Sequence, residues 1–265
     1  MGNAKTTSTV ADAKKKAQAQ VDAQQRRTVV MWIVAGVIVV GIVSALIAFI
    51  VRQGAIEDVA LADPSGAPVV SSDGGLGVGM SGIAGQDLDP AHTRLDVYFD
   101  FICPACGYFE NTQAATLDEL RAEGVVDVYY HPLAYLDPQS SGTQYSTRAA
   151  SAAVLVYQEA PEQFLSFVQQ LMVNQPAEGT TGLTDEQIQS IASAAGVADA
   201  VVAKIPDHEY AAWVRSASEA ANKAGVVYTP TLGLDGDIQD PTDPASIQWT
   251  QEGALRQALT EQSAG

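Results

Sequence analysis

The chain has 265 residues, of which 47% are hydrophobic, so it can form one packed domain with additional segments. It carries 14 basic and 31 acidic residues, which give a formal net charge of −17 at pH 7. Such an acidic chain repels phosphate backbones, so we expect no nucleic-acid partner. We interpret the acidity as a contribution to solubility.

The charge is unevenly distributed along the chain. Residues 1–28 hold six basic and two acidic side chains, a net of +4, and we define them as a cytoplasmic basic tail. The remaining residues hold 8 basic and 29 acidic side chains, a net of −21. Basic residues that precede a membrane span predict that the N-terminus stays in the cytoplasm.

An uncharged apolar run follows the basic tail over residues 29–51. As a helix it is about 34 Å long, enough for a hydrocarbon core of about 30 Å. A cleaved signal peptide is the alternative, but its apolar region usually has only about 7–15 residues. We therefore predict an uncleaved signal-anchor helix that crosses the lipid bilayer of the plasma membrane once. Everything after it would lie outside the cytoplasm.

Residues 52–93 contain eight glycines and show no sustained hydrophobic period. This composition predicts a flexible linker. It would leave the domain that follows free to meet partners near the membrane.

The pattern changes at Arg94, and residues 94–265 predict an α/β domain. Apolar and polar residues alternate from Leu95 to Phe101, which indicates a strand. A helix that ends at Gly124 and a second strand at 125–133 follow. This order implies a parallel strand pair with a right-handed crossover. We expect Tyr108 and Phe109 to pack this helix against the core.

A helical insertion is expected over about residues 140–224. Within it, Thr184 and Gln187 form the pattern of a capping box, and Pro206 is expected to break or bend the last helix, at about 198–224. Strand character returns at 225–232, and a final helix is expected from about 250 to 262.

The chain has two cysteines, Cys103 and Cys106. A pair so close in sequence closes no long loop and cannot staple the fold in the usual way. A four-cysteine zinc site is excluded by count, and none of the three histidines has ligand spacing to the pair. We expect no metal and no cofactor, which leaves redox chemistry as the main use of the thiols.

A strand that leads into Cys-x-x-Cys at the start of a helix favours an ionised thiol. Free N–H groups and the helix dipole stabilise negative charge there, and such a position lowers a cysteine pKa from about 8.5 to roughly 3.5–7.5. Cys103 would be the attacking thiolate, with Pro104 at the first helical position and Ala105 after it. Cys106, one turn on, would resolve the mixed disulfide. The alternative is a passive short-loop disulfide.

The segment YFDFICPACGYFE, followed by YTPTL about 125 residues later, resembles the thioredoxin superfamily, in particular the DsbA-like branch with its membrane-tethered actinobacterial forms. The resemblance implies a thioredoxin fold with an inserted helical subdomain. It also implies that Pro230 is the cis-proline that faces the cysteines, and that Thr229 and Pro230 bind the substrate. An ordinary trans proline at a strand edge is the alternative.

Two departures from the family pattern concern the active site. Ala105 stands where DsbA has a histidine that stabilises the thiolate, which suggests a less strongly oxidising couple. Val97 stands where relatives tend to have a buried carboxylate that accepts the proton of the second thiol. Strand alternation points Asp96 and Asp100 away from the face of Val97, so the sequence does not identify this acceptor.

The functional hypothesis is an extracytoplasmic thiol–disulfide oxidoreductase that oxidises cysteine pairs in secreted or surface proteins. Its expected partners are reduced or misoxidised substrate proteins and, by family analogy, a reoxidising membrane protein of the DsbB or VKOR type. The alternatives are a disulfide reductase, for example in cytochrome maturation, and a tethered binding or chaperone domain with an inert thiol pair.

Overall fold

The computed structural model describes residue 68 and residues 70–263 of the chain. The basic tail predicted at 1–28 and the signal anchor predicted at 29–51 lie outside the described residues. Within the described part, no helix combines the length and the apolar character that a bilayer crossing requires.

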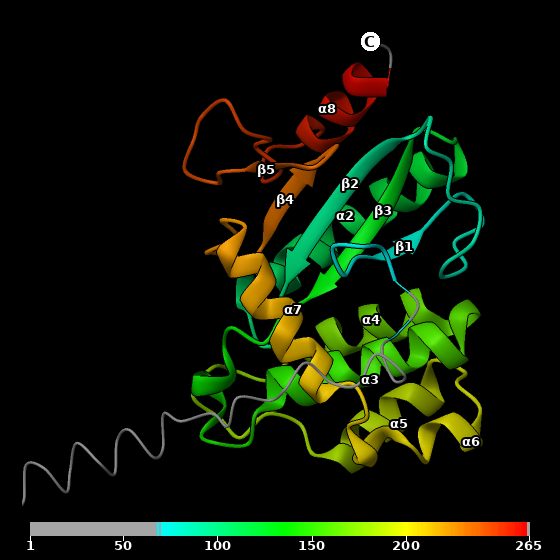
Figure 1. The fold of residues 1–265 in the computed structure, drawn as a ribbon, viewed down its shortest axis with the longest axis vertical. Helices are drawn as coiled ribbons and strands as arrows, with labels where there is room; N and C mark the ends of the chain where they lie inside the picture. The colour runs from blue at the N-terminus through cyan, green and yellow to red at the C-terminus, as the bar shows by residue number, and fades with distance from the viewer. Residues whose placement is uncertain (1–67, 69, 264–265) are drawn as a thin grey trace, which may run out of the picture. The chain divides into compact units, whose positions relative to one another are not determined.

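A five-stranded mixed sheet forms the centre of the described domain (Figure 1). Its strands are β1 Leu76–Val78, β2 Thr93–Phe99, β3 Val126–Pro132, β4 Thr231–Leu234 and β5 Asp237–Gln239. The spatial order is β1-β3-β2-β4-β5, and β2 and β3 are parallel while every other neighbouring pair is antiparallel. The parallel pair with a helical crossover is therefore confirmed.

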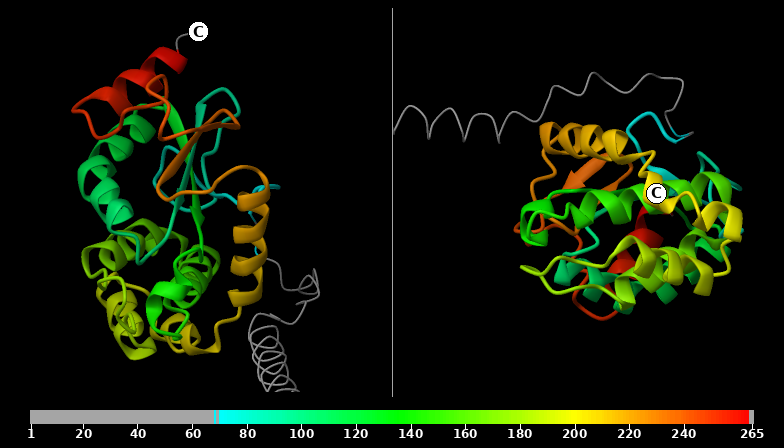
Figure 2. Two further views of the ribbon diagram at one scale, coloured as in Figure 1. Left: turned by 90° about the vertical axis from the view of Figure 1, so that its left-hand side faces the viewer. Right: turned by 90° about the horizontal axis from the view of Figure 1, so that it is seen from below.

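Helices cover both faces of the sheet and one of its ends. The α-helices are α2 Pro104–Ala122, α3 Tyr145–Glu159, α4 Phe164–Val173, α5 Asp185–Ala194, α6 Asp199–Val202, α7 Ala211–Lys223 and α8 Ala254–Ser263. Short 3-10 turns lie at η2 Asp137–Ser140, η3 Pro161–Gln163 and η4 Ile205–Asp207. Helices α2 and α7 lie on opposite faces of the sheet (Figure 2), and α3 to α6 form a helical subdomain beyond the ends of β2 and β3 (Figure 1). The predicted α/β fold with a helical insertion is confirmed.

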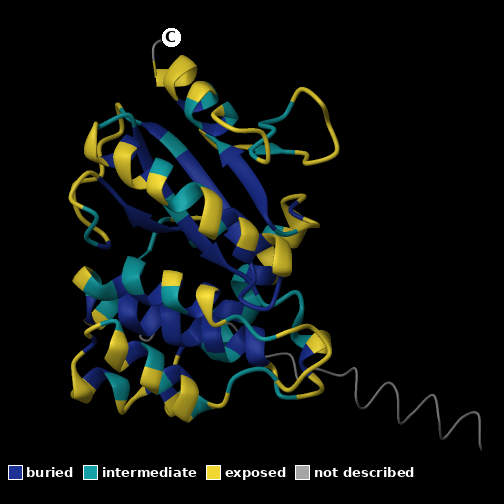
Figure 3. Ribbon diagram, turned by 180° about the vertical axis from the view of Figure 1, so that it is seen from behind, coloured by how far each residue is buried: buried dark blue, intermediate teal, exposed yellow. Residues whose placement is uncertain are grey.

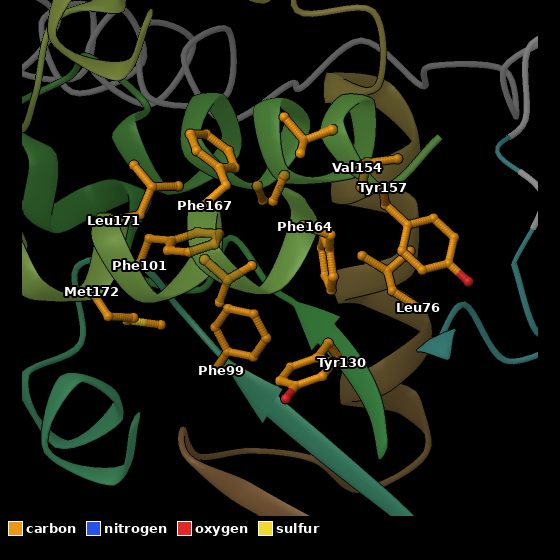
Figure 4. Packing of buried hydrophobic residues seen from close by; sticks show 14 of the residues in the cluster. Leu76, Phe99, Phe101, Tyr130, Val154, Tyr157, Phe164, Phe167, Leu171 and Met172 are labelled. Atoms are coloured by element: carbon orange, nitrogen blue, oxygen red, sulfur yellow. The ribbon is translucent and has the colours of Figure 1, made fainter. Parts of the chain in front are cut away.

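The core joins the sheet to the helical subdomain. Most residues of strands β1 to β4 and the inner sides of the surrounding helices are buried (Figure 3). Aromatic rings make this junction: Phe164 lies edge-on to Tyr130 and to Tyr157, with ring centroids 5.7 and 5.2 Å apart (Figure 4). Edge-to-face pairs of this kind add to the stabilisation that area burial alone provides. The subdomain is thus packed onto the sheet as part of one core.

The prediction of a flexible linker over 52–93 is wrong from residue 70 onward. Strand β1 pairs with β3, and Leu76 and Val78 are fully buried. The glycines here serve close backbone packing, since a Cβ at Gly79 would lie 2.0 Å from the carbonyl oxygen of Asp87. A short strand inside a glycine-rich stretch leaves too few apolar residues to produce a visible period.

Other boundaries differ locally from the prediction. The expected helix at 198–224 is divided into α6, η4 and α7, with His208 at a positive φ of 48° before α7. The strand expected at 225–232 begins only at Thr231, and the sequence did not indicate β5. The capping box at Thr184 is confirmed, because its hydroxyl accepts from the N–H of Gln187 and the Gln187 side chain accepts from the N–H of Thr184.

Candidate active site

The Cys-x-x-Cys segment lies where β2 gives way to α2. Cys103 is the N-cap residue of α2, with an extended backbone, and Pro104 takes the first helical position. The carbonyl of Cys103 accepts from the N–H groups of Cys106 at 3.0 Å and Gly107 at 3.2 Å. Proline suits the first position because its missing N–H has no helical partner there in any case. The predicted placement of these residues at a helix start is present in the structure.

The structure brings Cys103 beside the proline loop that lies 126 residues later in the chain. Its thiol donates to the carbonyl oxygen of Thr229 at 3.3 Å, and the Thr229–Pro230 peptide bond is cis. Pro230 is buried and Thr229 is half-buried. The Cys103 residue is itself only 5% exposed. Cys103, Cys106, Thr229 and Pro230 therefore form one site, while the side chains of Pro104 and Ala105 face solvent.

The pKa values of the two thiols are shifted in opposite directions. The hydrogen bond from Cys106 lowers the pKa of Cys103 to about 6, against the opposing effect of burial, with further help from Thr229 and the N–H groups of Cys106 and Ala105. Burial raises the pKa of Cys106 well above its usual 9.0, and the adjacent Cys103 sulfur adds to this. Both cysteines are free thiols in the structure. At neutral pH the pair thus holds one thiolate and one thiol, the arrangement that disulfide exchange requires.

Asp100 anchors the loop that carries Cys103 to the helical subdomain. Its carboxylate accepts from the N–H of Ile102 at 3.0 Å, from the Ser146 hydroxyl at 2.7 Å and from the N–H of Leu136 at 2.9 Å. Burial raises the pKa of Asp100 to about 6 in spite of these bonds. The Asp100 residue is completely buried.

Gln175 fixes the same loop from the other side. Its side-chain amide donates to the carbonyl oxygens of Phe101 at 3.1 Å and Cys103 at 2.8 Å. The absence of a side chain at Gly107 makes room for it, because a Cβ there would lie 2.8 Å from the Gln175 Oε1 atom. No sequence pattern indicates a role for Gln175, since it follows α4 and lies 72 residues from Cys103.

A second polar cluster lies on the opposite face of β2. Asp73, Asp96 and His131 each offer one possible ligand atom, and these atoms lie within 4.8 Å of one another. The guanidinium of Arg94 bonds both carboxylates, and His131 Nε2 lies 2.8 Å from Asp96 Oδ1. Arg94 thus supplies the positive charge that these carboxylates need, so we interpret the cluster as structural. His131 thus has a structural role in this cluster.

Tyr108 does not pack in the core as expected. It is 55% exposed, whereas Phe109 beside it is 2% exposed. Trp249 contacts both rings, with centroids 6.0 Å from Tyr108 and 5.2 Å from Phe109. Val227 and Tyr228, directly before Thr229, are also more than half exposed. Apolar side chains therefore extend to the surface on both segments that form the site.

Comparisons with known proteins agree with this geometry. The sequence model of a family described as thioredoxin matches residues 89–250, which is more than half of the chain. Serine/threonine-protein kinase PknE of Mycobacterium tuberculosis is 36% identical over 110 residues, which are 40% of this chain and 19% of PknE. The chain thus spans about a fifth of the length of the curated relatives that it matches.

Solved structures give longer matches. Reduced DsbA of Mycobacterium tuberculosis is 28% identical, with a TM-score of 0.58, over 71% of this chain and 91% of that one. DsbG of the same organism, a disulfide bond oxidoreductase in its reduced form, is 29% identical, with a TM-score of 0.58, over 71% of this chain and 86% of that one. From the family match, these structural likenesses and the Cys-x-x-Cys beside a cis-proline, the chain belongs to the thioredoxin family and its described domain is DsbA-like.

Proposed function

We propose that this chain is a protein disulfide oxidoreductase that oxidises cysteine pairs in secreted or surface proteins outside the cytoplasm. The opposite pKa shifts of Cys103 and Cys106, one helical turn apart beside a cis-proline, carry the proposal. A low-pKa thiol is both an effective attacking group near neutral pH and a good leaving group. The likeness to the disulfide oxidoreductases DsbA and DsbG supports the same chemistry.

The reaction starts from the Cys103–Cys106 disulfide. A substrate thiolate attacks the sulfur of Cys103, and the Cys103–Cys106 bond breaks with its electron pair on Cys106, which then takes up a proton. The second substrate thiolate attacks the substrate sulfur of the mixed disulfide, and Cys103 leaves as a thiolate. The substrate has lost two electrons to the enzyme, and a stabilised Cys103 thiolate makes this last step favourable.

Substrate binding is proposed for the loop of Thr229 and Pro230. The carbonyl of Thr229 already lies 3.3 Å from the Cys103 sulfur, so a chain that pairs with this loop would bring its own cysteine to the reacting atom. Strand addition of this kind uses main-chain hydrogen bonds and tolerates many sequences. The exposed side chains of Tyr108, Val227 and Tyr228 would contact apolar residues of reduced or misoxidised substrate proteins.

The location and the reoxidation route extend this proposal. We place the catalytic domain outside the plasma membrane, held by the apolar run at 29–51, with the basic tail in the cytoplasm. Reoxidation of the dithiol requires an electron acceptor, for which we propose a membrane protein of the DsbB or VKOR type that passes the electrons to a quinone. Fractionation of cells, combined with protease treatment of intact cells, tests both the anchor and its orientation.

Oxidative refolding of a reduced substrate protein tests the activity. The oxidised chain should transfer its disulfide, and Cys103→Ser should lose this activity entirely. A variant as active as the wild type would refute the enzyme in favour of a binding or chaperone domain. The equilibrium reduction potential tests the direction, since a value well below about −250 mV would favour a reductase.

A further inference from the structure

In the reaction proposed for this site, the proton of Cys106 still needs a group that donates and accepts it. Cys106 must gain a proton when it leaves the disulfide and lose it when it attacks a mixed disulfide. The residue is only 1% exposed, so bulk water has little access to it. The family resemblance implies a buried carboxylate at the strand position of Val97. Val97 is instead an apolar residue that is 2% exposed.

A small cavity is lined by both Cys106 and a carboxylate residue of the same helix. It offers about 10 Å³ to the centre of a water-sized sphere, room for about one water molecule. Its lining includes Cys106, Val97, Phe99, Glu110, Val168 and Met172. Tyr130 also lines it, and burial raises the pKa of that phenol, so it keeps its proton. Glu110 is therefore the carboxylate among the lining residues.

The spacing of Cys106 and Glu110 places both on one face of α2. The two residues are four positions apart on α2, so their Cβ atoms lie about 6 Å apart on one face. Side chains on a helix lean toward its N-terminus, which for Glu110 is the direction of Cys106. The Glu110 residue as a whole is half-buried, so part of it reaches the surface of the described domain.

The surroundings of Glu110 keep its proton available near neutral pH. Burial and, to a smaller extent, the carboxylate of Asp118 raise the pKa of Glu110 to about 7, against the guanidinium of Arg121, which lowers it. Of the elements packed here, α4 contributes the apolar Val168 and Met172, and β3 contributes Tyr130. A group with a pKa near the working pH is the most effective in general acid–base catalysis.

We propose that Glu110 exchanges the proton of Cys106 during disulfide exchange, in place of the strand carboxylate that Val97 replaces. The inference rests on the proposed function. When substrate attacks Cys103, the Cys106 sulfur leaves with the electron pair, and the carboxylic acid of Glu110 gives it a proton and becomes a carboxylate. In the reverse step the carboxylate takes the proton of Cys106, whose sulfur then attacks Cys103 and expels the bound thiolate.

The reaction of the reduced chain with 5,5′-dithiobis(2-nitrobenzoate) separates the two thiols. Attack by Cys103 releases one thionitrobenzoate in a phase whose rate depends on reagent concentration. Attack by Cys106 on the mixed disulfide releases the second in a phase independent of reagent. Only the second phase involves the proton of Cys106, so the first phase reports on the integrity of the site.

Glu110→Gln should slow the second phase about 10-fold or more at neutral pH and leave the first phase within about twofold. In the wild type the second phase should level off above about pH 7, where Glu110 is ionised, whereas in the variant it should keep rising with pH. Glu119→Gln is the matched control, since it removes the same charge from an exposed position of α2 and should change neither phase.

Second phases of equal rate in Glu110→Gln and wild type would overturn the inference. A loss shared by both phases would also overturn it, because it would indicate a distorted site. If Glu110→Gln fails to fold, the wild-type profile still decides: a second phase that rises tenfold for each pH unit from pH 6 to 8 excludes Glu110 as the base. Oxidative refolding by the wild type, measured alongside, shows separately whether the proposed function itself fails.

Discussion

The low pKa of Cys103 should make the stability of the reduced protein depend on pH. The pKa is about 6 in the folded chain and near 9.0 in the unfolded chain. Because the folded pKa is the lower one, the stabilisation is fully present above the unfolded value and is lost as the pH falls through about 6. Each pH unit between these values corresponds to about 1.4 kcal/mol. The ionised thiol should therefore stabilise the fold by about 1.4 kcal/mol at pH 7 and by about 3 kcal/mol at pH 8.

Urea unfolding of the reduced wild type and of Cys103→Ala, from about pH 5 to pH 8, measures this term. Asp100 and Glu110 also titrate in this range, but they do so in both proteins and cancel in the difference. Cys106 stays protonated throughout, because its pKa is raised. The gap in unfolding free energy should widen by about 3 kcal/mol from pH 5 to pH 8. A gap that does not change with pH, or an alkylation midpoint for Cys103 above about pH 8, would refute the reasoning.

Three further experiments test burial and packing, two at the site and one at β1. Asp100→Asn should flatten the pH dependence of stability. The folded pKa of about 6 lies above the usual 3.8, so the wild type should lose about 2.5 kcal/mol relative to the variant as the pH rises from about 4 to 7, which thermal unfolding can follow. Gly107→Ala should lower the free energy of unfolding of the wild type by about 1–3 kcal/mol, because the new Cβ would lie 2.8 Å from the Gln175 Oε1 atom. In a Gln175→Ala background the same substitution should lower it by less. Equal decreases in urea unfolding would contradict the contact. Gly79→Ala should destabilise the fold more than Gly77→Ala, since a Cβ at Gly79 would lie 2.0 Å from the Asp87 backbone, whereas a Cβ at Gly77 would meet side chains, the end of Leu88 at 2.9 Å and the Tyr129 ring at 3.0 Å; similar unfolding midpoints would argue against an ordered β1 region.

The features of the site that were predicted from sequence depend on short spacings. Pro104, directly after Cys103, indicates a helix start because proline suits the first helical position. The Thr184 cap depends only on Gln187, three residues further along the chain. The approach of Thr229 to Cys103 spans 126 residues, and only the family resemblance suggested it. Glu110 could have been found in advance, because its spacing of four from Cys106 on an expected helix already places both on one face.

The features that were missed are contacts between distant segments. Gln175 and Ser146 are ordinary polar residues in the sequence, and nothing near them indicates that they bind the loop before α2. The strand β1 was missed for a different reason. It has only three residues, too few for a visible alternation, and it is held in place by pairing with β3. Tertiary contacts override local propensity in such places.

The first turn of α2 also bears on the direction of electron flow. A mixed disulfide at Cys103 can be attacked either by the second substrate thiol, which completes oxidation, or by Cys106, which returns the substrate reduced. Cys106 attacks only as a thiolate, and burial keeps its pKa high, so its attack is slow until a base removes the proton. Cys103, with a pKa of about 6, is the better leaving group in the first of these reactions. A Cys106 proton that is removed slowly would give the substrate time to complete its own disulfide, which supports the oxidising direction that we propose.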